Sequence, residues 1–159
     1  MRVALSLLFL SLIACGPSNA EIKTAKAATY PAAPNTILDV AIQVTQRTYP
    51  VADVDIEHHM FRTATQFYSV EGGRESAGAD GFVTARGGSV SLTLVVKIVT
   101  TDVPGNQVAV SVVPKTFQVV AGSPQPRELL PDDPNLPPWV LGRVDTLALE
   151  IYKEAKKIH

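Results

Sequence analysis

The stretch DVDIEHHMFRT, residues 53–63, concentrates side chains that could bind a metal ion. Its carboxylates and imidazoles come from five residues, Asp53, Asp55, Glu57, His58 and His59. Carboxylate oxygens and imidazole nitrogens are common ligands of divalent metals. The sequence therefore offers these five residues as a candidate metal site, with the polar end of a β-hairpin as the alternative.

The spacing within this stretch favours the hairpin. Alternate residues of a strand lie roughly 6.5–7 Å apart, so the three carboxylates could reach one ion only if the chain bent around it. A calcium loop that begins Asp-x-Asp-x-acid needs glycine where His58 stands and a bidentate glutamate where Ala64 stands. Adjacent histidines on a strand also point to opposite faces. We interpret the stretch as a solvated hairpin turn and keep a metal-binding module as the alternative function.

Composition and motifs predict no catalytic residues. The sequence contains neither a GxSxG elbow nor a GxGxxG or Walker-type phosphate loop, and the third histidine is the last residue, His159. Its 14 basic and 15 acidic residues give a net charge of −1, which does not favour nucleic acid as a partner. We therefore predict that the protein is not an enzyme and does not bind nucleic acid.

The N-terminus carries the most specific pattern in the chain. Arg2 precedes an uncharged run from Val3 to Ala14, which is shorter than the about 20 apolar residues that span a bilayer and indicates a secretory signal. The only cysteine, Cys15, follows directly. The residues Leu12-Ile13-Ala14-Cys15 resemble the bacterial lipobox. The resemblance implies that residues 1–14 are a lipoprotein signal peptide and that Cys15 becomes the lipidated first residue.

This resemblance to bacterial lipoproteins also implies an anchor and a location. Such proteins carry a diacylglycerol and usually an N-acyl chain on the cysteine, and several chains together hold a protein lastingly at a membrane. Gly16 stands where an aspartate retains enteric lipoproteins in the inner membrane. We expect a protein of the outer membrane on its periplasmic side, with surface exposure also open, and no cofactor other than these lipids.

The elements behind the anchor are predicted from composition and apolar periodicity. Residues 15–35 are rich in Ala, Pro and small polar residues, which predicts a flexible tether with a span on the order of 25 Å. Residues 36–159 then form a single domain. Apolar residues that recur every three or four positions predict helices over 36–48 and 140–158.

Four strands are predicted between these helices, because residues 49–55, 60–70, 89–100 and 107–120 are rich in β-branched or alternating apolar residues. A helix over 56–68 is the rival interpretation of the second strand. A Pro-Gly turn joins the last two strands into a hairpin, and Pro114 favours an edge or a bulge. The order predicts a two-layer α+β fold, a four-stranded antiparallel meander with the N- and C-terminal helices packed on one face. This order resembles small lipoprotein domains that assist outer-membrane assembly.

Two loops complete the sequence. Residues 71–88 contain six glycines and predict a long loop between strands. Residues 123–139 contain six prolines together with apolar side chains, and proline-rich segments can bind partner grooves; the alternative is a crossover whose apolar residues cap the core. The candidate partner-binding residues are Leu129, Leu130, Leu136 and Trp139. We expect a protein partner in envelope assembly or maintenance, bound through the exposed face of the sheet, the unpaired edge near Pro114 or this crossover.

Overall fold

The computed structural model describes residues 17–76 and 85–158, and the lipobox with Cys15 lies outside these residues. Within them the chain is an α+β domain with three helices and one antiparallel sheet of seven strands, as the sequence predicted for its class. The elements in chain order are α1 (Asn19–Ala27), β1 (Thr29–Tyr30), α2 (Pro34–Gln46), β2 (Val51–Asp55), β3 (Met60–Thr63), β4 (Gln66–Tyr68), β5 (Val90–Thr100), β6 (Val108–Gln118), β7 (Arg127–Leu129) and α3 (Pro138–Ala155).

The sheet is built around the hairpin of β5 and β6, which pair over eleven residues each as the Pro-Gly turn predicted. The strand order is β1-β6-β5-β3-β2, with β4 also on β5 and β7 also on β6. The predicted four-stranded meander is therefore wrong in detail. The second predicted strand is split into β3 and β4, and two short strands, β1 and β7, come from the segments predicted as tether and crossover.

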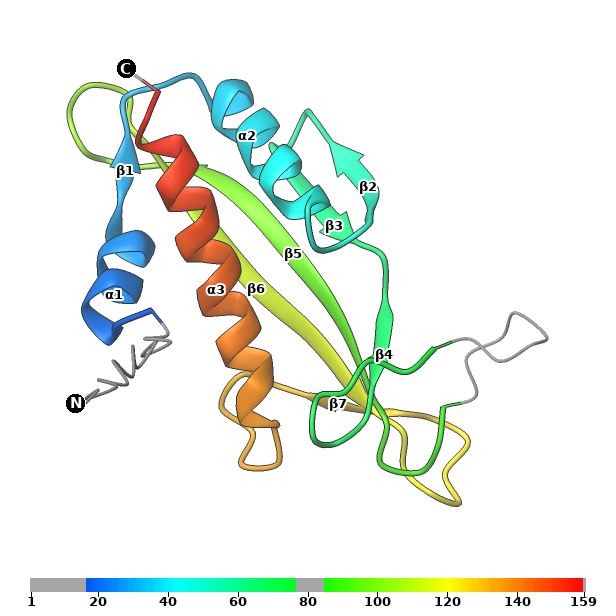
Figure 1. The fold of residues 1–159 in the computed structure, drawn as a ribbon. Helices are drawn as coiled ribbons and strands as arrows, with labels where there is room; N and C mark the ends of the chain where they lie inside the picture. The colour runs from blue at the N-terminus through cyan, green and yellow to red at the C-terminus, as the bar shows by residue number, and fades with distance from the viewer. Residues whose placement is uncertain (1–16, 77–84, 159) are drawn as a thin grey trace, which may run out of the picture.

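All three helices lie on one face of the sheet (Figure 1). Even-numbered residues of β5 point into this layer, where Leu94 and Val96 are fully buried in the core that α2 and α3 also line. The buried residues of α2 and α3 recur at helical spacing, so each of these helices buries one apolar stripe. The main buried residues of the two helices are Ile37, Leu38, Ala41, Val44, Val140, Val144, Leu147 and Ile151.

A β-bulge separates β3 from β4. Arg62 pairs with Val95 and Gln66 pairs with Leu92, so one strand advances four residues while β5 advances three. The extra residue reverses the faces of the sheet to which the following side chains point and interrupts the backbone ladder. The Thr63 side chain compensates for the interrupted ladder by accepting a hydrogen bond from the Leu94 amide at 2.9 Å. The rival helix over 56–68 is absent, since this segment pairs as strands.

Residues 19–30 correct the predicted tether. Ser18 and Glu21 form a capping box at the start of α1, Ala25 is buried, and Lys26 forms an ion pair with Asp145 of α3. Tyr30, in β1, is 4 % exposed and pairs with β6. This short segment is ordered because tertiary contacts with α3 and β6 supplement its weak apolar pattern.

Candidate binding surface

The structure places the predicted metal ligands in a hairpin between β2 and β3. Asp53 forms an ion pair with Arg62 across the two strands. Asp55 accepts a hydrogen bond from the His58 backbone amide at 3.0 Å and lies 2.8 Å from His58 Nδ1. These hydrogen bonds, the backbone one first, lower the pKa of the Asp55 carboxyl. Asp53 and Asp55 therefore each have a local partner.

The remaining members of the candidate metal site are also held apart. Glu57 is exposed in the turn. His59 has a φ of 49°, and its Nδ1 lies 2.9 Å from the Asn35 side-chain oxygen at the start of α2. Across residues 17–76 and 85–158, no group of three or more His, Cys, Asp or Glu side chains is arranged to hold a metal ion. The hairpin interpretation of this stretch describes what the structure shows.

The four candidate partner-binding residues of the proline-rich crossover do not share one exposed patch. Leu129 is buried on β7, whereas Leu130 next to it is 56 % exposed. Leu136 and Trp139 are half-buried and pack against the core. Of the four, only Leu130 offers a largely exposed apolar side chain to a partner.

Trp139 holds the segment that follows β4 against α3. Its indole Nε1–H donates to the Val70 carbonyl at 2.9 Å, and its ring lies 5.0 Å from the Tyr68 ring between centroids. The Arg143 guanidinium lies 4.4 Å from the Tyr68 ring centre and donates to the Gly72 carbonyl at 3.0 Å. We call these residues, Tyr68, Gly72, Trp139 and Arg143, the Trp139 cluster. Its polar atoms are used internally, so it stabilises the fold.

The sheet face opposite the helices is the surface that remains for binding. Odd-numbered residues of β5 and β6 point there because side chains alternate along a strand. Val99 and Val113 are 48 % and 43 % exposed on this face, and Lys97 is exposed beside them. No helix of the described chain lies over them (Figure 1). We call this surface the bare face.

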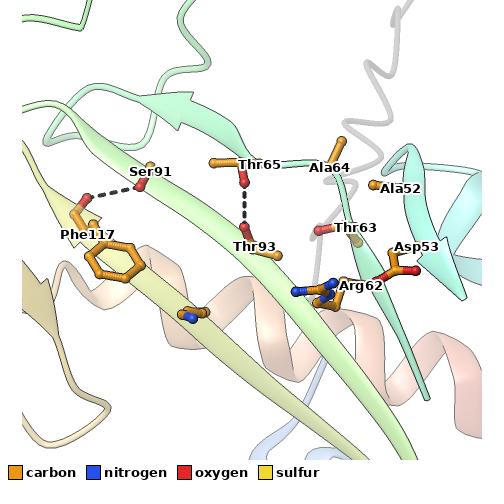
Figure 2. A pocket seen from close by; sticks show the side chains of 10 residues that line it. Ala52, Asp53, Arg62, Thr63, Ala64, Thr65, Ser91, Thr93 and Phe117 are labelled. Carbon is orange, nitrogen blue, oxygen red and sulfur yellow. Dashed lines mark hydrogen bonds and ion pairs between the residues drawn. The ribbon is translucent and has the colours of Figure 1, made fainter. Parts of the chain in front are cut away.

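The bulge between β3 and β4 opens a groove of about 330 Å³ on the bare face. Side chains of β2, β3, β5, β6 and the bulge line it, and Figure 2 shows Arg62 beside Asp53 and Thr65 beside Thr93. The Thr65 and Thr93 hydroxyls share a hydrogen bond of 2.8 Å, and Arg62 is oriented by Asp53 at one end. The lining residues are Ala52, Asp53, Arg62, Thr63, Ala64, Thr65, Ser91, Thr93, Lys115 and Phe117.

The groove presents a positive end and a hydroxyl-lined floor. Lys115 forms no salt bridge with any residue in the described ranges, and its ammonium lies 5.8 Å from the centre of the Phe117 ring. Arg62 shares its charge with Asp53. Hydroxyl groups and an ammonium group can donate hydrogen bonds to carboxylates and other polar oxygens. This arrangement can bind a polar or anionic group.

Of the groove residues, sequence reasoning named only Asp53, as a candidate metal ligand, and missed the others. Alternation along 89–100 already separates Thr93 from the apolar positions, which is the one usable signal. The bulge that brings Thr65 beside Thr93 has no local signature, since it follows from how β3 and β4 register on β5. Arg62 and Lys115 are isolated charges in the sequence. Only the sheet register brings both of them to the groove.

The comparisons add no family to this description, because no protein-family model and no curated protein matches the chain. Among the helices that the structure describes, none combines the length and the apolar character needed to cross a bilayer.

Proposed function

We propose that the protein is an outer-membrane lipoprotein, anchored through lipids on Cys15, which binds another envelope protein from the periplasmic side. Its role is non-catalytic and belongs to envelope assembly or maintenance. The lipobox supports the location, and the groove on the bare face supports binding. The metal-binding alternative has no supporting arrangement in the described residues.

The groove is the observation that carries the proposed binding. One solvated face is ordinary for an antiparallel sheet, so the bare face alone would indicate little. The concave site goes further, because it combines an aromatic contact surface, the Phe117 ring, with hydrogen-bond donors. The donors are the hydroxyls of Thr65 and Thr93 and the ammonium of Lys115, which has no salt-bridge partner among residues 17–76 and 85–158. It suits a protein surface that presents a carboxylate.

Site-specific photocrosslinking in native cells tests this proposal. A photoreactive amino acid at Thr93 stands in the groove, and one at Leu141, 42 % exposed on α3, stands on the opposite side as the matched control. We expect a discrete protein adduct from position 93, weakened by Lys115→Glu, and none of the same size from position 141. Identical adduct patterns from both positions would refute binding through the groove.

The anchor is tested separately with Cys15→Ser. We expect the variant to leave the membrane fraction as a soluble periplasmic protein or to accumulate as uncut precursor. Unchanged processing and unchanged membrane fractionation would contradict lipidation. This result is independent of the groove, so a failed anchor and a failed binding surface can be told apart.

A further inference from the structure

The outer edge of β6 is open in its middle. β1 pairs with Val108 and Ala109 at one end, and β7 pairs with residues 116–118 at the other. Over residues 110–115 no described strand lies on this edge. The open section is six residues long, about 20 Å at the usual strand rise. It is a gap in the sheet with an ordered strand on each side.

The ladder shows which backbone groups face this gap. Val119 and Gln107 form backbone hydrogen bonds with the two residues that flank β5, and the register between them is unbroken. The backbone N–H and C=O groups of odd-numbered β6 residues therefore point toward β5. The backbone N–H and C=O groups of even-numbered residues therefore point away from β5, into the gap. Val112 presents an N–H donor and a carbonyl acceptor there, whereas Pro114 presents a carbonyl alone, because proline has no N–H. No described strand pairs with Val112 or Pro114 on this side.

An apolar groove runs beside the gap on its helix side. Its volume is about 400 Å³, and its lining includes Val110 and Val112 of β6, Val144 and Ala148 of α3, and Lys26 of α1. Val110 and Val112 point toward the helices yet are only half-buried, unlike their fully buried neighbours in β5. A strand added at the gap would place alternate side chains in this groove.

The opposite side of the gap is cationic. A residue of an added strand that lies across from Lys115 would stand on the bare face, within reach of its ammonium group. Lys97, on the neighbouring strand, lies across from Ser111. Neither lysine is in a salt bridge with a residue of the described ranges. Acidic side chains on this side of an added strand would complement both charges.

The geometry points to an extended peptide segment of a partner protein as the occupant of this gap, about six residues long at the usual strand rise, with apolar and acidic residues in alternation. The apolar residues enter the groove beside Val144, and the acidic ones face Lys115. This inference deepens the proposed function and rests on it. The β6 strand of a second copy does not fit, because it is eleven residues long and its own ends carry β1 and β7.

Backbone-directed variants test the inference on the full-length protein in detergent, with a phage-displayed library of random linear octapeptides as the probe. Val112→Pro removes an outward N–H and leaves the ladder to β5 intact, as Pro114 already does two residues away. Val112→Thr is the matched control, since it keeps the N–H with a side chain of similar shape. Pro114→Val adds an outward donor.

We expect selected octapeptides to alternate apolar and acidic residues and to bind Val112→Pro at least about tenfold more weakly, since the loss combines a donor with a steric block. Binding to Val112→Thr should stay within about threefold of the parent, and binding to Pro114→Val should tighten by about threefold or more. Lys115→Glu should remove the preference for acidic residues.

Failure to enrich any peptide, or equal binding to Val112→Pro and Val112→Thr, would overturn the inference. If Val112→Pro does not fold, Pro114→Val decides alone, and unchanged affinity overturns it. Self-association in sedimentation that Val112→Pro abolishes would assign the gap to a second copy and also overturn it. Adducts from position 93 that persist in Val112→Pro, together with failed peptide selection, would leave the proposed function standing without the gap.

Discussion

Gly72 in the Trp139 cluster gives the sharpest test of the packing. Its φ is +88°, and a Cβ built on it would lie 2.8–3.0 Å from three atoms of the Trp139 ring. Carbon atoms in contact normally lie about 3.5–4.0 Å apart. A Gly72→Ala variant must therefore push the ring away from Tyr68 and weaken the hydrogen bond from its Nε1 to Val70.

The expected cost has two parts. The positive φ costs alanine about 1–2 kcal/mol, and overpacking against a held ring costs about 1–3 kcal/mol. We expect Gly72→Ala to lower the free energy of unfolding by about 3 kcal/mol, the sum of the two. Gly122→Ala is the matched control, because Gly122 has a φ of +79° and a Cβ added to it would meet no atom within 4 Å. It should show the first part alone, about 1–2 kcal/mol.

Urea unfolding followed by circular dichroism and by fluorescence measures both variants, and Trp139 is the only tryptophan in the chain. With a slope of roughly 1–3 kcal/mol per molar urea, Gly72→Ala should lower the midpoint by about 1–3 M. Adding Trp139→Leu should make the combined loss smaller than the sum of the two single losses. Equal losses in Gly72→Ala and Gly122→Ala would refute the contact between Gly72 and Trp139.

Three other predictions concern pH, the cluster and metal. Burial raises the pKa of Tyr30 to about 12 from an ordinary value of 10.0. The tyrosine of the unfolded state therefore ionises at lower pH than that of the folded state. The free energy of unfolding should fall by about 2–3 kcal/mol between pH 10 and pH 12. In Tyr30→Phe this part of the urea-measured pH dependence should disappear, and an unchanged decline would exclude Tyr30 as its source. Arg143→Met removes the guanidinium from the Tyr68 ring and from the Gly72 carbonyl, and it should lower the free energy of urea unfolding by about 2 kcal/mol. A decrease under about 0.5 kcal/mol would show that these contacts do not stabilise the fold. Equimolar Zn²⁺ should leave the melting temperature unchanged, since residues 53–59 do not converge on one ion, whereas a rise that His58→Ala abolishes would contradict this separation.

Local patterns suffice for the long elements of the fold. The apolar stripe that contains Val140 and Val144 predicts α3 close to its observed bounds, and alternation with the Pro-Gly turn predicts the β5–β6 hairpin. Such patterns work because burial of one face is visible in the spacing of residues along one segment. The hairpin turn at residues 56–59 is also readable, from spacing that fits no metal loop.

The short elements and the groove could not be predicted in this way. β1 and β7 have two and three residues, and each exists because β6 offers it hydrogen bonds. The helix α1 has one legible signal, the Ser18 and Glu21 spacing of a capping box, which the tether interpretation does not use. Thr65 and Lys115 reach one groove through the sheet register, which no single segment encodes.

The early start of α1 changes what the anchor would do mechanically. Only Gly16 and Pro17 separate Cys15 from the Ser18 cap, so a lipid on Cys15 would have a leash of about 11 Å at full extension, compared with the span on the order of 25 Å expected of a free tether. The domain would be confined to a thin layer at the membrane surface. A partner in the same leaflet would then meet it at high effective concentration, so that even a weak contact could be occupied. The early start of α1 would thus raise the apparent affinity of the domain for partners in the same membrane.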